Sequence, residues 1–385
     1  MAAQYELYLC DDRGRRLMPL NNLASFSASR IINGVGGFSA TLKSPSDLRA
    51  LQNYHYIENN IRADWQVQVW RKIRGPMKMW WSYFIQSWSW SQDEGGDQRF
   101  EIGGYGLNHL LTRRIVAAFA ESAQSAMTDY ADDMMKAVVT DSMEDNALPV
   151  PTAGTREWGD LTVAGNTSKG PSITLGFAWD RLLTLEGNGV LTQIANASRE
   201  AGGPEILFFV VPNTLSTKAV TYKFITVPDA YRDLTSGKGK VVFAPATGTL
   251  ANWSLSYDHS KEVNYVYALG QGLEADRTVE QVSDEARYKS SYWGRREGYA
   301  DVSNLEDDQV EAAGYDALSA GRPAVRVRGT PVSRRGQEYG RHYDIGDKVI
   351  VQAKSHKFPA LVAAAVVSQD EDGKITETTR LDFRD

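Results

Sequence analysis

The sequence predicts an α+β fold that is mainly β, and three observations lead to this prediction. The stretch from Trp80 to Trp90 is aromatic and alternates with the two-residue period of a β-strand. Alternating segments occur in both end regions of the chain, whereas helix-like spacing of apolar residues occurs mainly in between. A short pattern near residue 91 also recurs near residue 368, so the two β regions look related.

The first hundred or so residues are predicted to form one β unit. Asn33-Gly34 is a strong hairpin signal, because both residues tolerate positive φ. The segment Ser44–Asn60 has only a weak pattern, in which Leu48 and Leu51 mark one helical turn. About six short strands joined by turns predict a small sandwich or barrel. The strands are expected at Tyr5–Cys10, Phe26–Ile32, Gly37–Leu42, Asp64–Arg71, Trp80–Trp90 and Arg99–Gly104, with a hairpin tip at Ser91–Asp97.

Helical spacing first appears where this unit ends, at Leu107, Leu110, Leu111 and Ile115. Further helices are predicted over residues 128–143, 190–201 and 305–320. Asp129 is expected to cap the first of these, with Asp132 and Asp133 in its first turn, and a capping box at 303–306 is expected to begin the last. Strands are expected at Glu205–Val211, Thr221–Val227, 253–257 and 263–270, and in several segments from residue 324 onward.

Two patterns occur twice in the same order. Asp64–Arg71 and Asp347–Lys354 both consist of an aspartate, an alternating strand and a terminal cation. The tetrapeptide Ser-Gln-Asp-Glu occurs at 91–94 and again at 368–371, each time beside a glycine-containing hairpin tip. Turns draw on few residue types, so one match could be chance. Two matches in the same order predict a duplicated β unit.

Composition sets the class of protein and the partners to expect. The net charge of −6 argues against a firmly bound nucleic acid, because phosphate binding favours a basic surface. No apolar run approaches the ~18 residues of a membrane span, and no signal peptide is visible. The single cysteine, Cys10, fits assembly in a reducing cytoplasm. Ten Trp and eighteen Tyr suit large interfaces as well as β structure.

The sequence shows no concentrated catalytic or metal site. The five histidines are isolated, and zinc, phosphate-loop and nucleophile-elbow motifs are absent. The acidic pairs Asp132-Asp133 and Asp307-Asp308 lie at expected helix starts, where they stabilise the helix dipole, although a glycosidase pair assembled from distant residues stays open. We therefore expect an assembly component rather than an enzyme, with no cofactor and no metal.

Several stretches resemble a known protein family. SRIINGVGGFSATL, ADWQVQVWR and FEIGGYGLNHLLTRRIV followed by ADDMMKAVV are similar to tail-tip hub proteins of long-tailed phages, the Gp37-like group related to the baseplate hubs of contractile tails. The C-terminal YGRHYDIGDKVIVQ is similar to the closing barrel of that family. The resemblance covers residues 5–145 and 255–385.

The resemblance implies two related β-barrel domains with helical and mixed domains inserted between them. The expected domains are a first barrel at 1–112, a mixed α/β insertion at 113–250, and a second barrel at 251–385 with a helical excursion near 303–321. Three subunits would then form a homotrimeric ring whose six barrels imitate sixfold symmetry. The positions that match the family's barrel strands and helix would define the fold and its assembly: Arg30, Asn33, Gly36, Arg71, Gly104, Leu111, Arg113, Arg114, Gly346 and Asp347.

The resemblance also implies a location and a set of partners. The protein would lie at the tail tip of a virion assembled in the host bacterial cytoplasm. It would contact other copies of itself, a sixfold distal tail ring protein, a tail spike or fibre protein and the end of the tape-measure protein, with DNA only in transit. One alternative is a carbohydrate-binding module for host recognition, using Trp80-Trp81 and Trp88 with Trp90. The weaker alternative is a cell-wall hydrolase.

Overall fold

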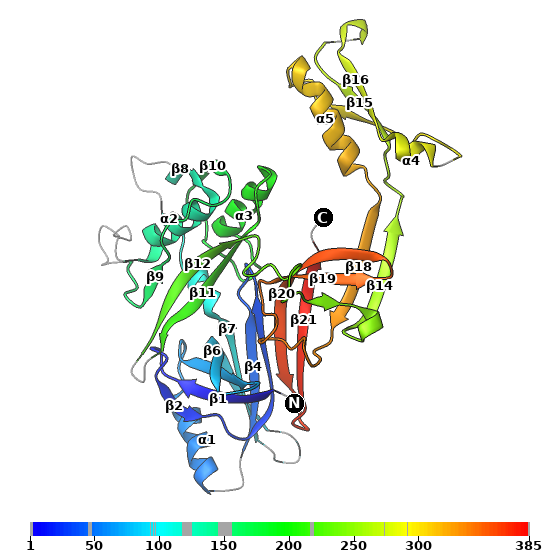
Figure 1. The fold of residues 1–385 in the computed structure, drawn as a ribbon. Coiled ribbons are helices and arrows are strands. Elements are labelled where there is room, and N and C mark those ends of the chain that lie inside the picture. The colour runs from blue at the N-terminus through cyan, green and yellow to red at the C-terminus, as the bar shows by residue number, and fades with distance from the viewer. Residues whose placement is uncertain are drawn as a thin grey trace. The chain divides into compact units, whose positions relative to one another are not determined.

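The computed structural model describes residues 3–44, 48–92, 94, 96, 98–117, 125–144, 156–215, 219–272, 274–290 and 292–383 (Figure 1). The chain forms two compact units. Unit 1 contains Met1–Ala251 and Thr330–Asp385, and unit 2 contains Asn252–Gly329. The first and last segments of the chain thus lie in one compact unit. The predicted domain bounds at residues 112 and 250 stay a prediction.

Unit 1 is built on one large sheet. Eleven strands pair in the order β13-β19-β20-β3-β4-β7-β6-β5-β1-β2, with β21 along the other edge of β20. The fold is therefore mainly β, as predicted, and strands from the two ends of the sequence share one sheet. The strands are β1 (Gln4–Cys10), β2 (Arg16–Pro19), β3 (Leu23–Ile31), β4 (Gly37–Lys43), β5 (Gln66–Lys72), β6 (Lys78–Gln92), β7 (Gln98–Gly106), β13 (Val242–Phe243), β19 (Lys348–Ala353), β20 (His356–Gln369) and β21 (Ile375–Phe383).

The sheet is strongly curled, because strands that are not neighbours in it touch through their side chains. The hydroxyl of Tyr83 on β6 donates to the carbonyl of Ser29 on β3 at 3.1 Å. The rings of Tyr5 on β1 and Phe26 on β3 lie 6.4 Å apart, centre to centre. Backbone hydrogen bonds between the described strands do not close the sheet into a ring. Its distant strands are instead connected by side-chain contacts. Between residues 80 and 85, β6 is buried on both faces, where the sequence predicted alternating burial. Tyr83 faces β3, whereas Phe84 packs against Tyr222 outside this sheet, with ring centres 6.1 Å apart.

The two ends of the chain carry matching antiparallel hairpins. In both β6–β7 and β20–β21, six consecutive residue pairs separate a bulge from the tip. The bulges lie at Ile85/Ser87 and Val362/Ala364, and the tips follow Gln92 and Gln369. Each hairpin is preceded by one further antiparallel strand, β5 or β19. The predicted repeat thus has the same strand order and the same hairpin register in both copies.

One detail of the predicted repeat is wrong by a residue. The amide of Asp64 donates to the carbonyl of Ile85, and the amide of Gly346 donates to the equivalent carbonyl of Val362. Asp64 and Gly346 also share left-handed φ angles, 70° and 84°. Asp347 therefore corresponds to Trp65 and not to Asp64. The sequence match aligned two aspartates, whereas the backbone aligns the two left-handed positions.

The N-terminal region contains a helix that the sequence pattern understated. The segment assigned one helical turn is the helix α1 (Leu48–Asn60), which buries Tyr54 and Ile57. The short helix after β7 is a 3-10 helix, η1 (Leu107–Arg113), and its residues 107–112 are buried. Ile115 lies beyond η1 and forms a β-bridge with Arg181.

The middle of unit 1 holds a small mixed layer. β11 and β12 form a three-stranded sheet with β9, and β8 pairs with β10. The helix α2 packs against β12 and α3. The first five residues of β11 are buried on both faces. These elements are β8 (Ser125–Tyr130), α2 (Ala131–Met143), β9 (Leu161–Val163), β10 (Ser172–Phe177), α3 (Val190–Glu200), β11 (Ile206–Leu215), β12 (Val220–Pro228) and the 3-10 turn η2 (Pro245–Thr247).

The start of α2 differs from the prediction. Tyr130 occupies the N-cap position without a side-chain cap, so Asp129 does not cap the helix and lies in β8 instead. Asp132 and Asp133 are buried and both accept from Nζ of Lys136, at 2.7 Å and 3.1 Å. They also accept from the backbone amides of residues 167–169. Their main role is thus to hold this loop against α2, which goes beyond stabilising the helix dipole.

Unit 2 is a three-stranded sheet with one helix packed on it. β15 lies between β16 and the parallel strand β17, and α5 covers one face around Val266, Val282 and Leu318. Glu306 is the N-cap of α5 without a side-chain cap, so the predicted capping box does not form. The chain enters unit 2 along β14 and leaves it along β18, which pair with each other. The elements are β14 (Leu250–Asp258), β15 (Tyr265–Leu269), η3 (Glu274–Asp276), β16 (Val279–Ser283), α4 (Glu285–Lys289), β17 (Glu297–Asp301), α5 (Asp307–Ala320) and β18 (Ala324–Pro331).

None of the helices that the structure describes has both the length and the apolar character needed to cross a membrane.

Candidate functional site

A buried polar contact joins the two β units of unit 1, and we call it the seam (Tyr5, Arg71 and Glu377). Arg71 on β5 donates from Nε and Nη2 to Oε1 of Glu377 on β21, at 3.0 Å and 2.6 Å. The hydroxyl of Tyr5 donates to the same carboxylate oxygen. The side chains of Arg71 and Glu377 are only 6% and 16% exposed. Burial and the Glu377 carboxylate raise the pKa of Tyr5, so its hydroxyl keeps its proton and remains a donor.

A second buried cation lies next to the seam. Arg30 on β3 stacks over the ring of Trp81 at 4.3 Å and donates to Asp344 at 3.4 Å. Behind it, Nε1 of Trp80 donates to the hydroxyl of Tyr339 at 3.3 Å. The guanidinium therefore lies against aromatic faces, which attract cations most strongly where water is excluded.

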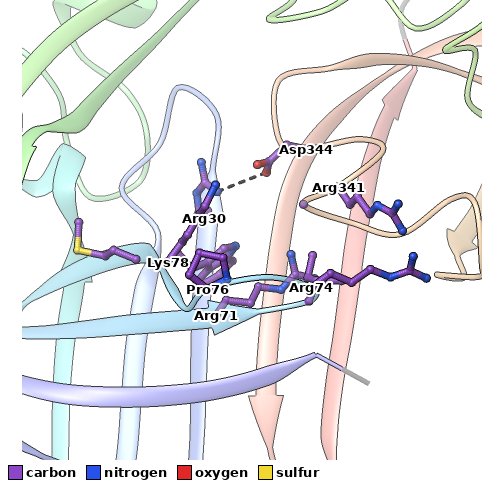
Figure 2. A pocket seen from close by; sticks show the side chains of 11 residues that line it. Arg30, Arg71, Arg74, Pro76, Lys78, Arg341 and Asp344 are labelled. Atoms are coloured by element: carbon purple, nitrogen blue, oxygen red, sulfur yellow. Dashed lines mark hydrogen bonds and ion pairs between the residues drawn. The ribbon is translucent and has the colours of Figure 1, made fainter. Parts of the chain in front are cut away.

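Between these groups and the protein surface lies a cavity of about 330 Å³, which we call the cationic pocket (Figure 2). Five cationic side chains line it, against the single carboxylate of Asp344. Its walls also contain the apolar side chains of Ile73, Pro76 and Met79. The cationic residues come from β3, from the β5–β6 hairpin and from the loop before β19: Arg30, Arg71, Arg74, Lys78 and Arg341.

Two asparagines join the first β unit to β11. Asn33 accepts from the amide of Phe208 at 2.8 Å and donates to the carbonyl of Ile206 at 3.1 Å. Asn108, which the sequence analysis did not single out, accepts from the amide of Val210 at 2.7 Å and donates to the carbonyl of Gly34 at 2.8 Å. The two side chains thus supply partners for backbone groups along β11. The Asn33-Gly34 hairpin signal predicted the turn but not this second role.

Three of the predicted glycines lie where a side chain would collide with backbone or require an unusual φ. A Cβ on Gly36, which has a φ of 70°, would lie 2.4 Å from the carbonyl oxygen of Ser29. A Cβ on Gly104 would lie 2.4 Å from the carbonyl oxygen of Phe84. Gly346 takes the left-handed position before β19.

The basic pair Arg113-Arg114 at the end of η1 contacts groups within the chain. Arg113 forms a two-pronged ion pair with Asp64, one contact of which is 2.9 Å, and this hydrogen bonding lowers the pKa of Asp64. Arg114 stacks over Trp158 at 4.2 Å and donates to the carbonyl of Arg156 at 3.3 Å. Leu111 is fully buried. Both arginines therefore have partners within the chain.

The neighbouring histidine is held neutral. His109 is nearly buried in η1, where its Nδ1 lies 3.1 Å from the hydroxyl of Thr112 and its ring lies against Tyr105. Burial, followed by the charge of Arg113, lowers its pKa to about 4. It is a packed core residue rather than a ligand.

Asp347 anchors the start of β19. It accepts from Nε of Arg232 at 3.0 Å and from the amide of Asp344 at 2.7 Å, while its own side chain is 1% exposed. Burial raises the pKa of Asp347 even though Arg232 opposes the shift. The ten predicted residues thus do not converge on one point, and only Arg30 and Arg71 line the cationic pocket.

The described part of the chain contains no cluster of three His, Cys, Asp or Glu side chains that could hold a metal ion. Of the tryptophans proposed for sugar stacking, Trp80 and Trp81 are buried and Trp88 is half-buried, whereas Trp90 is 48% exposed and packs on Phe100 with ring centres 5.1 Å apart. The aromatic residues that are most exposed lie in unit 2, at Tyr292 and Trp293.

Two solved structures of tail proteins are similar to this chain over nearly its whole length, and the first of them supports the fold. The 43 kDa tail protein of prophage MuSo2 from Shewanella oneidensis is 11% identical, with 99% of this chain and 98% of that chain covered at a TM-score of 0.53. A tail protein from Neisseria meningitidis MC58 is 13% identical, with 99% and 97% covered at a TM-score of 0.47. No curated protein sequence matches.

A protein family, described as Siphovirus ReqiPepy6 Gp37-like protein, matches residues 6–375 of this sequence. That match includes the β6–β7 hairpin and the cationic pocket, and it ends at Ile375, where β21 begins. The chain therefore belongs to the Siphovirus ReqiPepy6 Gp37-like protein family.

Proposed function

We propose that the protein is the structural hub of a phage tail tip, in which three copies form a ring. This ring adapts the sixfold tail above it to a threefold spike or fibre below it, and DNA passes through its centre. The proposed partners are a sixfold distal tail ring protein, a spike or fibre protein and the end of the tape-measure protein. The tail tip would assemble in the host cytoplasm.

The matched register of the two hairpins is the observation that supports this proposal. One chain contains two β units with the same strand order, the same bulge and the same tip length. A threefold ring of such chains presents six similar units, which is the number that a sixfold partner requires. We propose that these units are the two barrels of the family, with 113–250 and the 303–321 region as insertions.

The molar mass of the assembled particle tests the proposal. Purified protein at tail-assembly concentrations should sediment with three times the mass of one 42.7 kDa chain. Images of tail tips should place six β units around the axis. A monomer at all concentrations, together with a tip that has no threefold ring, would refute the hub.

The wall of the channel offers an independent test. DNA carries about one charge per ~1.7 Å of axis, so each cation that faces it would retard its passage. We propose that acidic side chains outnumber basic ones on the inner wall, and the intrachain contacts of Arg113 and Arg114 support this. An inner wall dominated by Lys and Arg would contradict the proposal.

We also propose that the protein is not an enzyme. Incubation with peptidoglycan should release no sugar or peptide fragments. Release at sub-stoichiometric protein would instead favour a cell-wall hydrolase with a site assembled from distant residues.

A carbohydrate-binding role in host recognition is a second candidate, because unit 2 exposes a group of aromatic side chains. Tyr292, Trp293 and Tyr299 are 95%, 88% and 75% exposed. Flat exposed rings suit stacking on sugars as well as contacts with proteins. Glycan-array binding that Trp293→Ala abolishes would favour this role, and binding that survives the change would reject it.

A further inference from the structure

The cationic pocket contains a buried cation with one donor that lacks a partner. Nε of Arg30 is buried and makes no hydrogen bond within the described residues. The hydrogen bond from this guanidinium to a carboxylate is long, at 3.4 Å, and the Arg30 side chain is only 14% exposed. A buried guanidinium costs free energy unless its donors are matched. An additional anion in the pocket would compensate the charge of this guanidinium.

The pocket as a whole also has excess positive charge. Arg71 is paired with Glu377, and Arg341 with Glu338 at 3.0 Å. Arg74 lies 4.0 Å from the same Glu338, which therefore faces two cations. Counting Asp344 together with these two glutamates, three carboxylates face five cations, which leaves two positive charges in excess. This excess stands out on a chain whose net charge is −6.

We propose that the cationic pocket binds an acidic peptide segment of a neighbouring protein, whose carboxylates reach Arg30, Arg74, Lys78 and Arg341 (Figure 2). Guanidinium groups match carboxylate geometry with paired hydrogen bonds. Figure 2 shows Arg74 and Arg341 on one side of the pocket and Lys78 on another, so a bound segment would meet cations from several directions.

The lining favours a peptide over nucleic acid. Ile73, Pro76, Met79 and Trp80 give the pocket an apolar surface that suits the side chains next to an acidic residue. DNA is bound along a stripe of cations that follows its phosphates, whereas these cations surround a cavity of about 330 Å³. The overall acidic charge of the chain also disfavours a nucleic-acid site.

The proposed acidic segment is a further binding partner of the hub. It rests on the proposed function only in one respect, namely that the neighbouring protein is taken to be a tail protein. The two can fail separately. Ring stoichiometry reports on the hub, whereas peptide binding by the purified full chain reports on the pocket.

The test measures binding of a short fluorescent peptide of glutamate and leucine by anisotropy, at about 150 mM salt so that weak surface attraction is screened. The variant R74Q/K78Q/R341Q changes only exposed lining cations, so the fold should persist. Its matched control, K72Q/K357Q/R380Q, removes the same charge from exposed residues that do not line the pocket. We expect the pocket variant to bind the peptide at least about tenfold more weakly, and the control to bind as the unchanged protein does.

Three further arms make the result decisive. The peptide with glutamine in place of glutamate should not bind, and inorganic phosphate should compete only weakly. A DNA duplex that displaces the peptide at lower concentration would show that the pocket is a phosphate site and would overturn the proposal. Equal losses in the pocket variant and the control, or no saturable peptide binding, would overturn it as well.

Discussion

Changing Glu377 to Leu should destabilise unit 1 far more than an ordinary surface substitution. The change leaves the Arg71 guanidinium, which is 6% exposed, without the carboxylate that accepts from it at 3.0 Å and 2.6 Å. Breaking one partner of a buried ion pair costs about 3–5 kcal/mol, because the remaining charge stays buried. The hydroxyl of Tyr5 loses its acceptor in the same variant, which adds to the cost.

The double variant R71M/E377L provides the control. With both charges gone, no uncompensated group remains, and the loss in free energy of unfolding should be at least about 2 kcal/mol smaller than the sum of the two single losses. Urea titrations of the four proteins, followed by far-ultraviolet circular dichroism, measure these values. A loss below about 1 kcal/mol for Glu377→Leu, or simple additivity, would show that water reaches the pair and would refute the reasoning.

Three further predictions can be tested in the same assay. Asn108→Ala leaves the amide of Val210 and the carbonyl of Gly34 without partners, so it should cost about 2–5 kcal/mol. Gly36→Ala forces a Cβ to within 2.4 Å of a backbone oxygen and should cost more than Gly373→Ala, where φ is also positive but no atom lies within 4 Å. Equal losses would contradict that explanation. Because the pKa of His109 is about 4 in the fold, against about 6.5 when unfolded, the unfolded state binds more protons between these values. Stability should therefore fall by about 1–2 kcal/mol from pH 7.5 to pH 5, and His109→Gln should remove this part of the loss.

Most strands were predictable from sequence because the two-residue alternation of apolar and polar side chains is a local property of the chain. The alternating segments and the Asn33-Gly34 turn correspond to β3, β4 and the loop between them. Burial was less predictable, since residues 80–85 of β6 are covered on both faces by elements that are distant in sequence, among them β3 and β12. The helix α1 was understated because its buried residues, such as Tyr54 and Ile57, are interspersed with polar and aromatic ones.

The candidate site was less predictable than the fold. Arg30 and Arg71 were identified through the resemblance, but their partners Asp344 and Glu377 lie about three hundred residues away in the sequence. Asn108 contacts β11 a hundred residues downstream, and no local pattern distinguishes it from a surface amide. Charged and amide side chains acquire their roles from long-range contacts, which a periodicity cannot reveal.

The seam also shows how the two β units have become different from one another. By hairpin register, Glu377 of the second unit corresponds to Phe100 of the first, since they face the equivalent residues Val367 and Trp90. Phe100 is fully buried in its own unit. The backbone of the repeat therefore tolerates either an apolar or a charged residue at this position, and the charge occurs in the unit that faces Arg71. A seam built on one acid and one base from different units favours pairing of unlike units over like ones. In the proposed ring, this asymmetry would determine that the first β unit of each subunit lies beside the second β unit. The six similar units would then alternate in a fixed order around the threefold axis.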